Sequence, residues 1–155
     1  MSRPAIPNDQ RLIVALDLPS GNEARELVEA LGDSVSFYKV GLELFTGADG
    51  FAVVDWLSTY GKQVFVDLKF FDVPATVARA VKQLHGRNIA FATVHGNDAI
   101  MQAAAEVSGD VGILAVTVLT SLDSADMRDL GFDCDIPALV RSRAHRALTL
   151  GCAGV

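Results

Sequence analysis

Three charged side chains stand close together at the end of one apolar run. The run Val64-Phe65-Val66 is typical of a buried strand, and it leads into Asp67, Lys69 and Asp72. Because side chains alternate along a strand, Asp67 and Lys69 are expected on one face. Charges are tolerated at such a position only when they are paired. The segment therefore predicts either a structural ion pair or a reaction centre in which a carboxylate holds an ammonium.

Polar residues also follow the other apolar runs. Strands are predicted at residues 12–17, 35–40, 63–69, 89–95 and 111–119, and polar side chains come at or just past their ends: Asp17, Lys39, Asp67 with Lys69, His95 and Thr120. Strands that alternate with helices imply a parallel sheet. In a (β/α)8 barrel, residues from several strand ends converge on one active-site face. An open doubly wound sheet commonly has a glycine-rich first turn, which Leu18-Pro19-Ser20-Gly21 is not. We therefore predict a TIM (β/α)8 barrel.

The helices between these strands carry recognisable start and stop signals. Ser20 and Glu23 form a capping-box pattern before the first helix, and Gly32 stands where that helix should end. Pro74 suits the first turn of a later helix, and Asp135 is expected to cap the last one. A helix with Phe51, Val54 and Leu57 on its inner face is predicted after the second strand. Further helices are predicted over residues 99–107, 124–130 and 136–150.

These elements predict two segments, a loose N-terminal tail at residues 1–10 and a barrel domain at residues 11–155. The domain holds about the first five βα units, and residues 152–155 are expected to open a sixth strand. A complete barrel typically needs about 250 residues. We therefore expect the 155 residues to be part of a longer protein, or to be completed by residues from elsewhere.

Composition narrows the function classes. Half of the residues are hydrophobic and the mean hydropathy is +0.32, which suits one domain with a substantial core. The net charge of −6 argues against a general nucleic-acid surface. No apolar run approaches the roughly 20 residues of a membrane span. Cys134 and Cys152 match no metal or redox spacing, so we expect reduced thiols and a cytoplasmic location.

Charge patterning alone leaves the role of the strand-end cluster open. Alternating carboxylates and ammonium groups hold a lysine in a fixed place and keep it protonated. That arrangement suits a reaction that forms a carbanion and protonates it at once. It suits a structural ion-pair network equally well.

Five motifs taken together resemble orotidine 5′-phosphate decarboxylase. They are Val14-Ala15-Leu16-Asp17, Tyr38-Lys39-Val40-Gly41, the segment D-L-K-F-F-D-V-P-A-T at residues 67–76, Val94-His95-Gly96 and Val118-Leu119-Thr120-Ser121. Their order and spacing match that family over essentially the whole chain, although D-x-K-x-x-D alone is shared with relatives. Phe71 and Val73 stand where His and Ile are frequent in the family, and neither difference touches a charged position.

The resemblance implies a homodimeric (β/α)8 barrel, free of metal and cofactor, that converts orotidine 5′-phosphate to uridine 5′-phosphate in the last step of UMP biosynthesis. It implies that Lys69 protonates carbon 6 of the pyrimidine after carbon dioxide leaves, and that Asp67 lies beside the substrate carboxylate. The further roles that it implies are ribose contacts for Asp17 and Lys39, contacts into the partner subunit's site for Asp72 and Thr76, and contacts near the base for Thr120 and Ser121. His95 is better interpreted as a hydrogen-bonded core residue than as a catalyst.

The family's phosphate-binding residues come from later βα loops and are not among these 155 residues. We therefore expect the isolated segment to be inactive. One rival is a magnesium-dependent sugar-phosphate decarboxylase or aldolase of the same barrel group, such as 3-keto-L-gulonate 6-phosphate decarboxylase. Those enzymes resemble one another in having Glu at the second strand end, whereas Lys39 stands there in this chain and would repel a divalent cation. A second rival is a non-catalytic protein, either a barrel that has lost its activity or a binding module.

Overall fold

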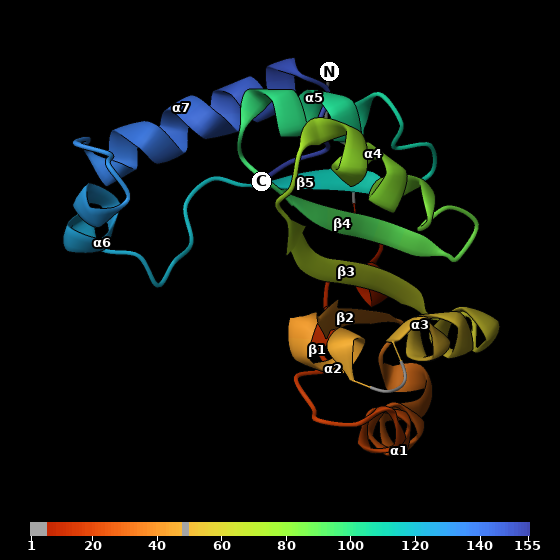
Figure 1. Ribbon diagram of the computed structural model, residues 1–155. Coiled ribbons are helices and arrows are strands. Elements are labelled where there is room, and N and C mark those ends of the chain that lie inside the picture. Colours follow the sequence, from red (N-terminus) through yellow and green to blue (C-terminus); the bar gives the residue numbers. More distant parts are fainter. Residues whose placement is uncertain (1–5, 48–49) are drawn as a thin grey trace. The chain divides into compact units, whose positions relative to one another are not determined.

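The computed structural model describes residues 6–47 and 50–155 (Figure 1). Its strands form one sheet in the order β1-β2-β3-β4-β5, with bounds β1 Val14–Ala15, β2 Phe37–Gly41, β3 Gln63–Phe70, β4 Ile89–His95 and β5 Gly112–Val116. The pairing of β1 with β2 and of β2 with β3 is parallel. Because sequential strands are neighbours and helices come between them, the architecture is the βα repeat that the sequence predicts.

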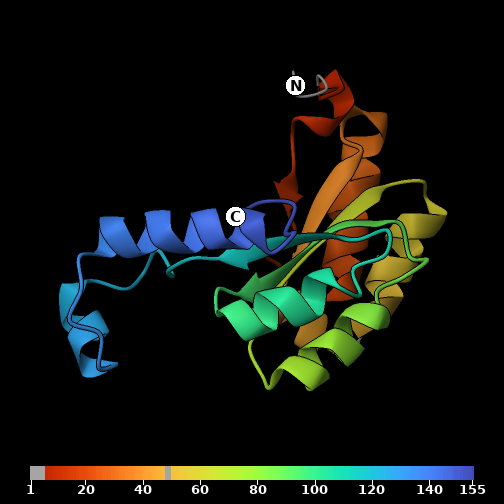
Figure 2. The ribbon, with the colours of Figure 1, turned by 90° about the horizontal axis from the view of Figure 1, so that it is seen from above.

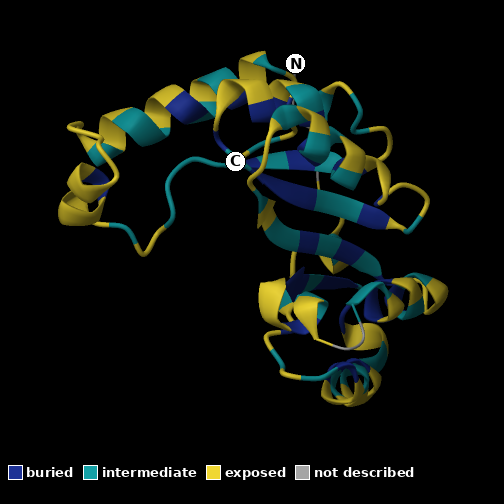
Figure 3. Cartoon of the chain, viewed as in Figure 1, coloured by how far each residue is buried: buried dark blue, intermediate teal, exposed yellow. Residues whose placement is uncertain are grey.

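The chain divides into two compact units, each of which is described by itself. The first unit contains the residues up to Leu68 together with His85–Phe91, and the second contains Lys69–Leu84 and Ala92–Val155. Figure 3 shows that buried residues concentrate along the strands, whose apolar side chains form much of the core.

The helices of the first unit follow the predicted signals closely. Its helical segments are η1 Asn8–Gln10, α1 Gly21–Leu31, η2 Gly32–Ser34, α2 Leu42–Thr46 and α3 Gly50–Thr59. The oxygen of Ser20 accepts a hydrogen bond from the backbone N–H of Glu23 at 3.3 Å, and Gly32 ends α1 with a φ of +51°. Both predicted caps of α1 are therefore confirmed. The short helix α2 was not predicted.

The second unit contains the remaining helices, α4 Pro74–Lys82, α5 Asp98–Ala105, α6 Ser124–Asp129 and α7 Ile136–Thr149. Helices α4 and α5 pack against each other (Figure 2). Pro74 opens α4 as predicted, and the carboxylate of Asp135 caps α7 by accepting from the backbone N–H of Ala138 at 2.9 Å. Gly96 follows β4, where a Cβ atom would lie 2.5 Å from the carbonyl oxygen of Val116. Only glycine permits this close approach.

Two strands are several residues shorter than predicted, and β2 begins at Phe37 and not at Val35. The strand expected over residues 12–17 is regular only in β1, although the backbone N–H of Leu16 still donates to the carbonyl oxygen of Lys39 at 2.9 Å. The strand expected over residues 111–119 ends at Val116, and a turn closes between Leu119 and Leu122. In both places the apolar run continues past the last strand residue, so hydropathy alone overestimated the strand length.

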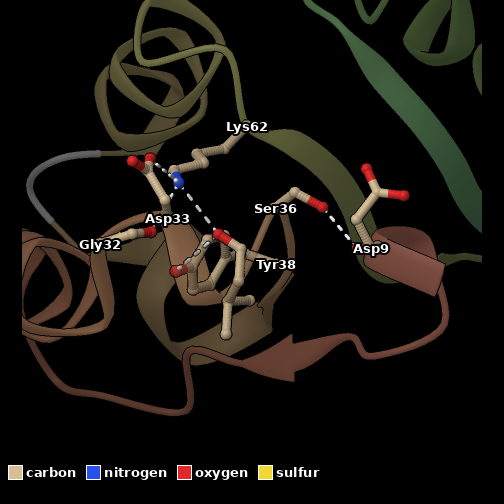
Figure 4. Close-up of polar contacts among 7 residues, drawn as sticks. Asp9, Gly32, Asp33, Ser36, Tyr38 and Lys62 are labelled. Atoms are coloured by element: carbon tan, nitrogen blue, oxygen red, sulfur yellow. Dashed lines mark hydrogen bonds and ion pairs between the residues drawn. The ribbon is translucent and has the colours of Figure 1, made fainter.

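Two further predictions concern the first ten and the last four residues of the sequence. Within the predicted tail, residues 6–10 carry η1, and the hydroxyl of Ser36 donates to the backbone oxygen of Asp9 (Figure 4). Residues 1–5 lie outside the described residues, so the tail stays a prediction. Residues 152–155 were expected to open a sixth strand. Of these residues, Gly154 forms an isolated parallel β-bridge with Leu114. No helix in the described part of the chain combines the length and the apolar character that crossing a membrane requires.

Candidate active site

An ion-paired triad lies in the first unit. The ammonium of Lys39 lies 3.0 Å from Oδ1 of Asp17 and 3.8 Å from Oδ2 of Asp67. Lys39 belongs to the middle one of three parallel strands, opposite Ala15, while Asp67 pairs with Gly41. This register places one lysine between carboxylates that come from either side. The structure therefore brings three of the predicted site residues together, although Lys39 and Asp67 lie within β2 and β3 and not at their ends as predicted.

The members of the triad differ in exposure. The side chain of Asp17 is 64% exposed, whereas those of Lys39 and Asp67 are 22% and 15% exposed. A Cβ atom on Gly41 would lie 3.4 Å from Oδ1 of Asp17 and 3.7 Å from Nζ of Lys39. A larger side chain at position 41 would crowd the ion pair, so glycine keeps the space beside it open. A charged group that is ordered but still accessible is suited to bind a polar ligand.

Lys69 lies two residues after Asp67 on β3 and belongs to the second unit. Its φ is +50°, in the left-handed region, and its backbone N–H donates to the hydroxyl of Thr93 at 2.9 Å. The predicted shared face of Asp67 and Lys69 assumed an extended backbone. Since Lys69 is not extended, strand alternation does not determine the direction of its side chain.

His95, which ends β4, stacks on the ring of Phe71. The ring centroids are 4.1 Å apart with an interplanar angle of 23°, and Nδ1 of His95 lies 2.9 Å from Oδ1 of Asn97. His95 is only half-buried, so it is not the core residue that the sequence predicted, although its ring nitrogen lies within hydrogen-bonding distance of Asn97. Its partner Phe71 is 66% exposed, so the stack forms part of the surface.

Asp72 and Thr76 occupy the start of α4. Asp72 is exposed, and its Oδ1 accepts from the backbone N–H of Val73 at 2.6 Å. The hydroxyl of Thr76 accepts from the guanidinium of Arg79 at 3.1 Å. Asp72 lies between two large apolar side chains, Phe71 and Val73, which are 66% and 63% exposed.

A cavity of about 440 Å³ lies within the second unit. Its lining is mostly apolar and includes Lys69, Phe71, His95, Met127, Phe132 and Arg143. Thr120 and Ser121 lie in the loop after β5 and are exposed. The neighbouring residues Val118, Leu119 and Leu122 do line the cavity. The cavity therefore joins Lys69 and His95 to the loop that carries Thr120 and Ser121.

Arg143 was missed by sequence reasoning. Its side chain is buried, and Nη1 donates to the carbonyl oxygen of Thr117, just past the end of β5, at 2.5 Å. Burial, and then the nearby Arg146, lower the pKa of the Arg143 guanidinium. A signal was present, because Arg143 lies four residues from Leu139 and from Ala147, on the row of α7 that turns inward.

The predicted site residues thus fall into two groups. Asp17, Lys39 and Asp67 form the triad of the first unit, and Lys69, Asp72, Thr76, His95, Thr120 and Ser121 belong to the second unit. Strand β3 carries the last residue of the first group and the first residue of the second. Across the described residues, no cluster of three or more His, Cys, Asp or Glu side chains is arranged to hold a metal ion.

This arrangement can be compared with known proteins. The model of the "Orotidine 5′-phosphate decarboxylase / HUMPS family" matches residues 10–155. The chain belongs to this family. The resemblance stated from the five motifs is therefore confirmed, and so is the fold class, part of a (β/α)8 barrel.

Curated family members are similar over the whole chain. The orotidine 5′-phosphate decarboxylase of Methylococcus capsulatus is 67% identical over 155 residues, which are 100% of this chain and 64% of that protein. The orotidine 5′-phosphate decarboxylase of Stenotrophomonas maltophilia is 47% identical over 159 residues, which cover 100% of this chain and 66% of that protein. The chain thus spans about two thirds of the length of these relatives.

Solved structures from the family share the fold. The crystal structure of orotidine 5′-phosphate decarboxylase from Lactobacillus acidophilus has a TM-score of 0.84 and 34% identity, covering 91% of this chain and 68% of that one. The enzyme from Methanocaldococcus jannaschii, crystallised with the inhibitor BMP, has a TM-score of 0.72 at 22% identity, covering 90% and 63%. The second likeness concerns the fold alone.

Proposed function

We propose that this chain carries the reaction centre of a cofactor-free orotidine 5′-phosphate decarboxylase, which forms uridine 5′-phosphate for pyrimidine biosynthesis. The observation that carries the proposal is the Asp17–Lys39–Asp67 triad, followed two residues later by Lys69, in a chain of this family. The similar proteins from Methylococcus capsulatus and Lactobacillus acidophilus are both orotidine 5′-phosphate decarboxylases, which supports the same activity.

In the proposed reaction, the bond between carbon 6 and the carboxylate breaks, and carbon dioxide leaves without the bonding electron pair. That pair remains on carbon 6 as a carbanion. The ammonium of Lys69 donates one proton to it, giving the C–H bond of the product and a neutral amine. A fixed positive charge near a developing negative charge lowers the barrier, because the ammonium does not reorganise during the reaction.

The remaining residues bind and orient the substrate. We assign the ribose hydroxyls to Asp17 and Lys39, since the triad offers an accessible carboxylate and an ordered ammonium 3.0 Å apart. Asp67 lies beside the substrate carboxylate. Thr120 and Ser121 approach the base from the exposed loop after β5. His95 keeps the structural role that its stack with Phe71 supports.

The proposed enzyme is a cytoplasmic homodimer in which Asp72 and Thr76 contribute to the partner's site. Two exposed apolar side chains, Phe71 and Val73, flank Asp72, and a second copy of the chain would remove them from water. The cytoplasmic assignment is supported by two cysteines, Cys134 and Cys152, that form no disulfide.

The first experiment measures turnover of orotidine 5′-phosphate by the protein expressed from its complete reading frame, in the presence of a chelator. We expect activity with chelator, and a loss of about 10³-fold or more in Lys69→Ala with an unchanged circular dichroism spectrum. Activity that chelation abolishes would indicate the magnesium-dependent alternative. Full turnover by Lys69→Ala would exclude Lys69 as the proton donor.

The shared site is tested by subunit mixing. Asp72→Asn and Lys69→Ala chains are each expected to be nearly inactive as homodimers. Their mixture should regain activity, because one site of each hybrid dimer would contain both native residues. Absence of recovery, despite subunit exchange shown by native mass spectrometry, would contradict the assignment of Asp72 to the partner's site.

A further inference from the structure

The backbone of Lys69 adopts a conformation that lysine rarely adopts. Among residues 6–47 and 50–155, two non-glycine residues have a positive φ, Lys69 at +50° and Asn88 at +54°. Asparagine is one of the residues that tolerate this region, and the side chain of Asn88 donates to the carbonyl oxygen of Lys62 at 2.9 Å. Lysine is not among the residues that tolerate this region well, so contacts with the surrounding structure are needed to hold Lys69 there.

Thr93 makes a contact that can hold the backbone of Lys69 in this conformation. It lies within β4, its side chain is buried with the residue only 6% exposed, and its hydroxyl accepts the backbone N–H of Lys69 at 2.9 Å. Both residues belong to the second compact unit. The hydrogen bond joins the backbone of Lys69 to a fixed point in the neighbouring core.

We propose that Thr93 is a positioning residue for the lysine that donates the proton. Its hydroxyl fixes the backbone of Lys69 in the left-handed conformation, and the backbone sets the direction from which the ammonium reaches carbon 6. Thr93 touches neither substrate nor reacting atoms and acts only through Lys69. This inference rests on the proposed function, since it assigns Thr93 a part in the same reaction.

The chemistry of threonine makes the inference testable. Valine has nearly the shape of threonine but no hydroxyl, while serine keeps the hydroxyl and loses the methyl group. Displacing a reacting group by about 1 Å can cost on the order of 10²-fold in rate. Because the substrate is bound by other residues, loss of the hydroxyl should lower kcat much more than it changes KM.

The experiment compares Thr93→Val, Thr93→Ser and the control Thr149→Val in the protein expressed from its complete reading frame. Thr149 also uses its hydroxyl for a backbone contact, with the carbonyl oxygen of His145 on exposed α7. We expect kcat to fall at least about 10-fold in Thr93→Val with KM within about threefold. Thr93→Ser should retain kcat within about threefold, and the control should match the wild type. A kcat for Thr93→Val within twofold of the wild type, or an equal loss in Thr93→Ser, would overturn the inference.

A second measurement separates this inference from the proposed function. Amide hydrogen exchange at residue 69 should be faster in Thr93→Val than in Thr93→Ser, whether or not the protein is active. Unchanged exchange would overturn the positioning role, whereas inactive wild-type protein with the expected exchange would refute the proposed function alone. If Thr93→Val does not fold, Thr93→Cys replaces it, because a thiol is a weak acceptor. The kcat and the exchange at residue 69 of Thr93→Cys are then compared with those of Thr93→Ser.

Discussion

Two lysines of the first unit, Lys62 just before β3 and Lys39 in the middle of β2, have different surroundings. Lys62 comes directly before β3, and its ammonium donates to the carbonyl oxygens of Gly32 at 2.7 Å and Val35 at 3.0 Å (Figure 4). Its side chain is 9% exposed. Lys39, in β2, is 22% exposed and lies between the carboxylates of Asp17 and Asp67.

The difference shows how the partners of a lysine indicate its role. Backbone carbonyls are fixed, so the ammonium of Lys62 joins the end of α1 to the strand that follows. Carboxylates carry charge and accept hydrogen bonds from ligands, so the ammonium of Lys39 forms part of an accessible polar surface. In a (β/α)8 barrel, the carboxyl ends of the strands hold the active site and the amino ends contribute stability. Lys62, at the amino end of β3, fits this division, and the ammonium of Lys39, from the middle of β2, contacts Asp17 just past the end of β1.

In the comparison of these two lysines, the largest effect is expected from Lys39→Met, which removes the positive charge of the triad while keeping a similar length. We expect kcat/KM to fall about 10²- to 10³-fold, because an ordered ammonium is lost beside the substrate. The melting temperature should fall modestly, because Asp17 is 64% exposed and stays hydrated, whereas Asp67, which is 15% exposed, loses one ionic contact. Steady-state kinetics and calorimetry of the same samples measure both quantities. Full activity of the Lys39→Met variant would show that Lys39 does not belong to the active site.

Lys62→Met should show the opposite pattern. The substitution leaves the carbonyl oxygens of Gly32 and Val35 without their buried donor. We expect the free energy of unfolding in urea to fall by about 1–3 kcal/mol. At a temperature where the variant stays folded, kcat/KM should remain within about threefold of the wild type. A Lys62→Met variant that keeps its stability but loses its activity would contradict the division of roles between the two lysines.

A smaller effect is expected from Tyr38→Phe at alkaline pH. Tyr38 is fully buried beside Lys62 (Figure 4), its hydroxyl donates to the carbonyl oxygen of Val35, and burial raises its pKa above the ordinary value of 10.0. The folded state therefore favours the neutral phenol. This contribution is complete below pH 10 and is lost as the pH rises toward the folded pKa. We expect stability to fall more steeply above pH 10 in the wild type than in Tyr38→Phe, as urea unfolding at several pH values would show.

The smallest effect is expected from Asp33→Asn. The carboxylate of Asp33 lies 3.9 Å from the ammonium of Lys62 and is fully exposed. Water and salt screen such a pair, so stability and activity should both match the wild type. A clear loss of stability would mean that the ion pair, and not the two carbonyl contacts, holds Lys62 in place.

Sequence reasoning succeeded where the signal is local. The caps at Ser20 and Asp135 depend on residues three positions apart, and the structure contains both. The short helix α2, which directly follows β2, was missed because five residues are too few for a helical period to be evident. Arg143 was missed because the polarity of arginine predicts an exposed position, whereas its aliphatic stem and the carbonyl oxygen of Thr117 allow it to be buried.

The sequence by itself determined the order of strands and helices, the polar residues at the strand ends and the family. These properties follow from hydrophobic periodicity, capping residues and motif spacing, which are all properties of the sequence itself. The tertiary structure alone decided that Lys39 lies 3.0 Å from Asp17, that the ammonium of Lys62 donates to backbone carbonyl oxygens, and that the hydroxyl of Thr93 accepts the backbone N–H of Lys69. Each of these contacts joins residues that are more than 20 positions apart, and only the packing of the folded chain brings them together.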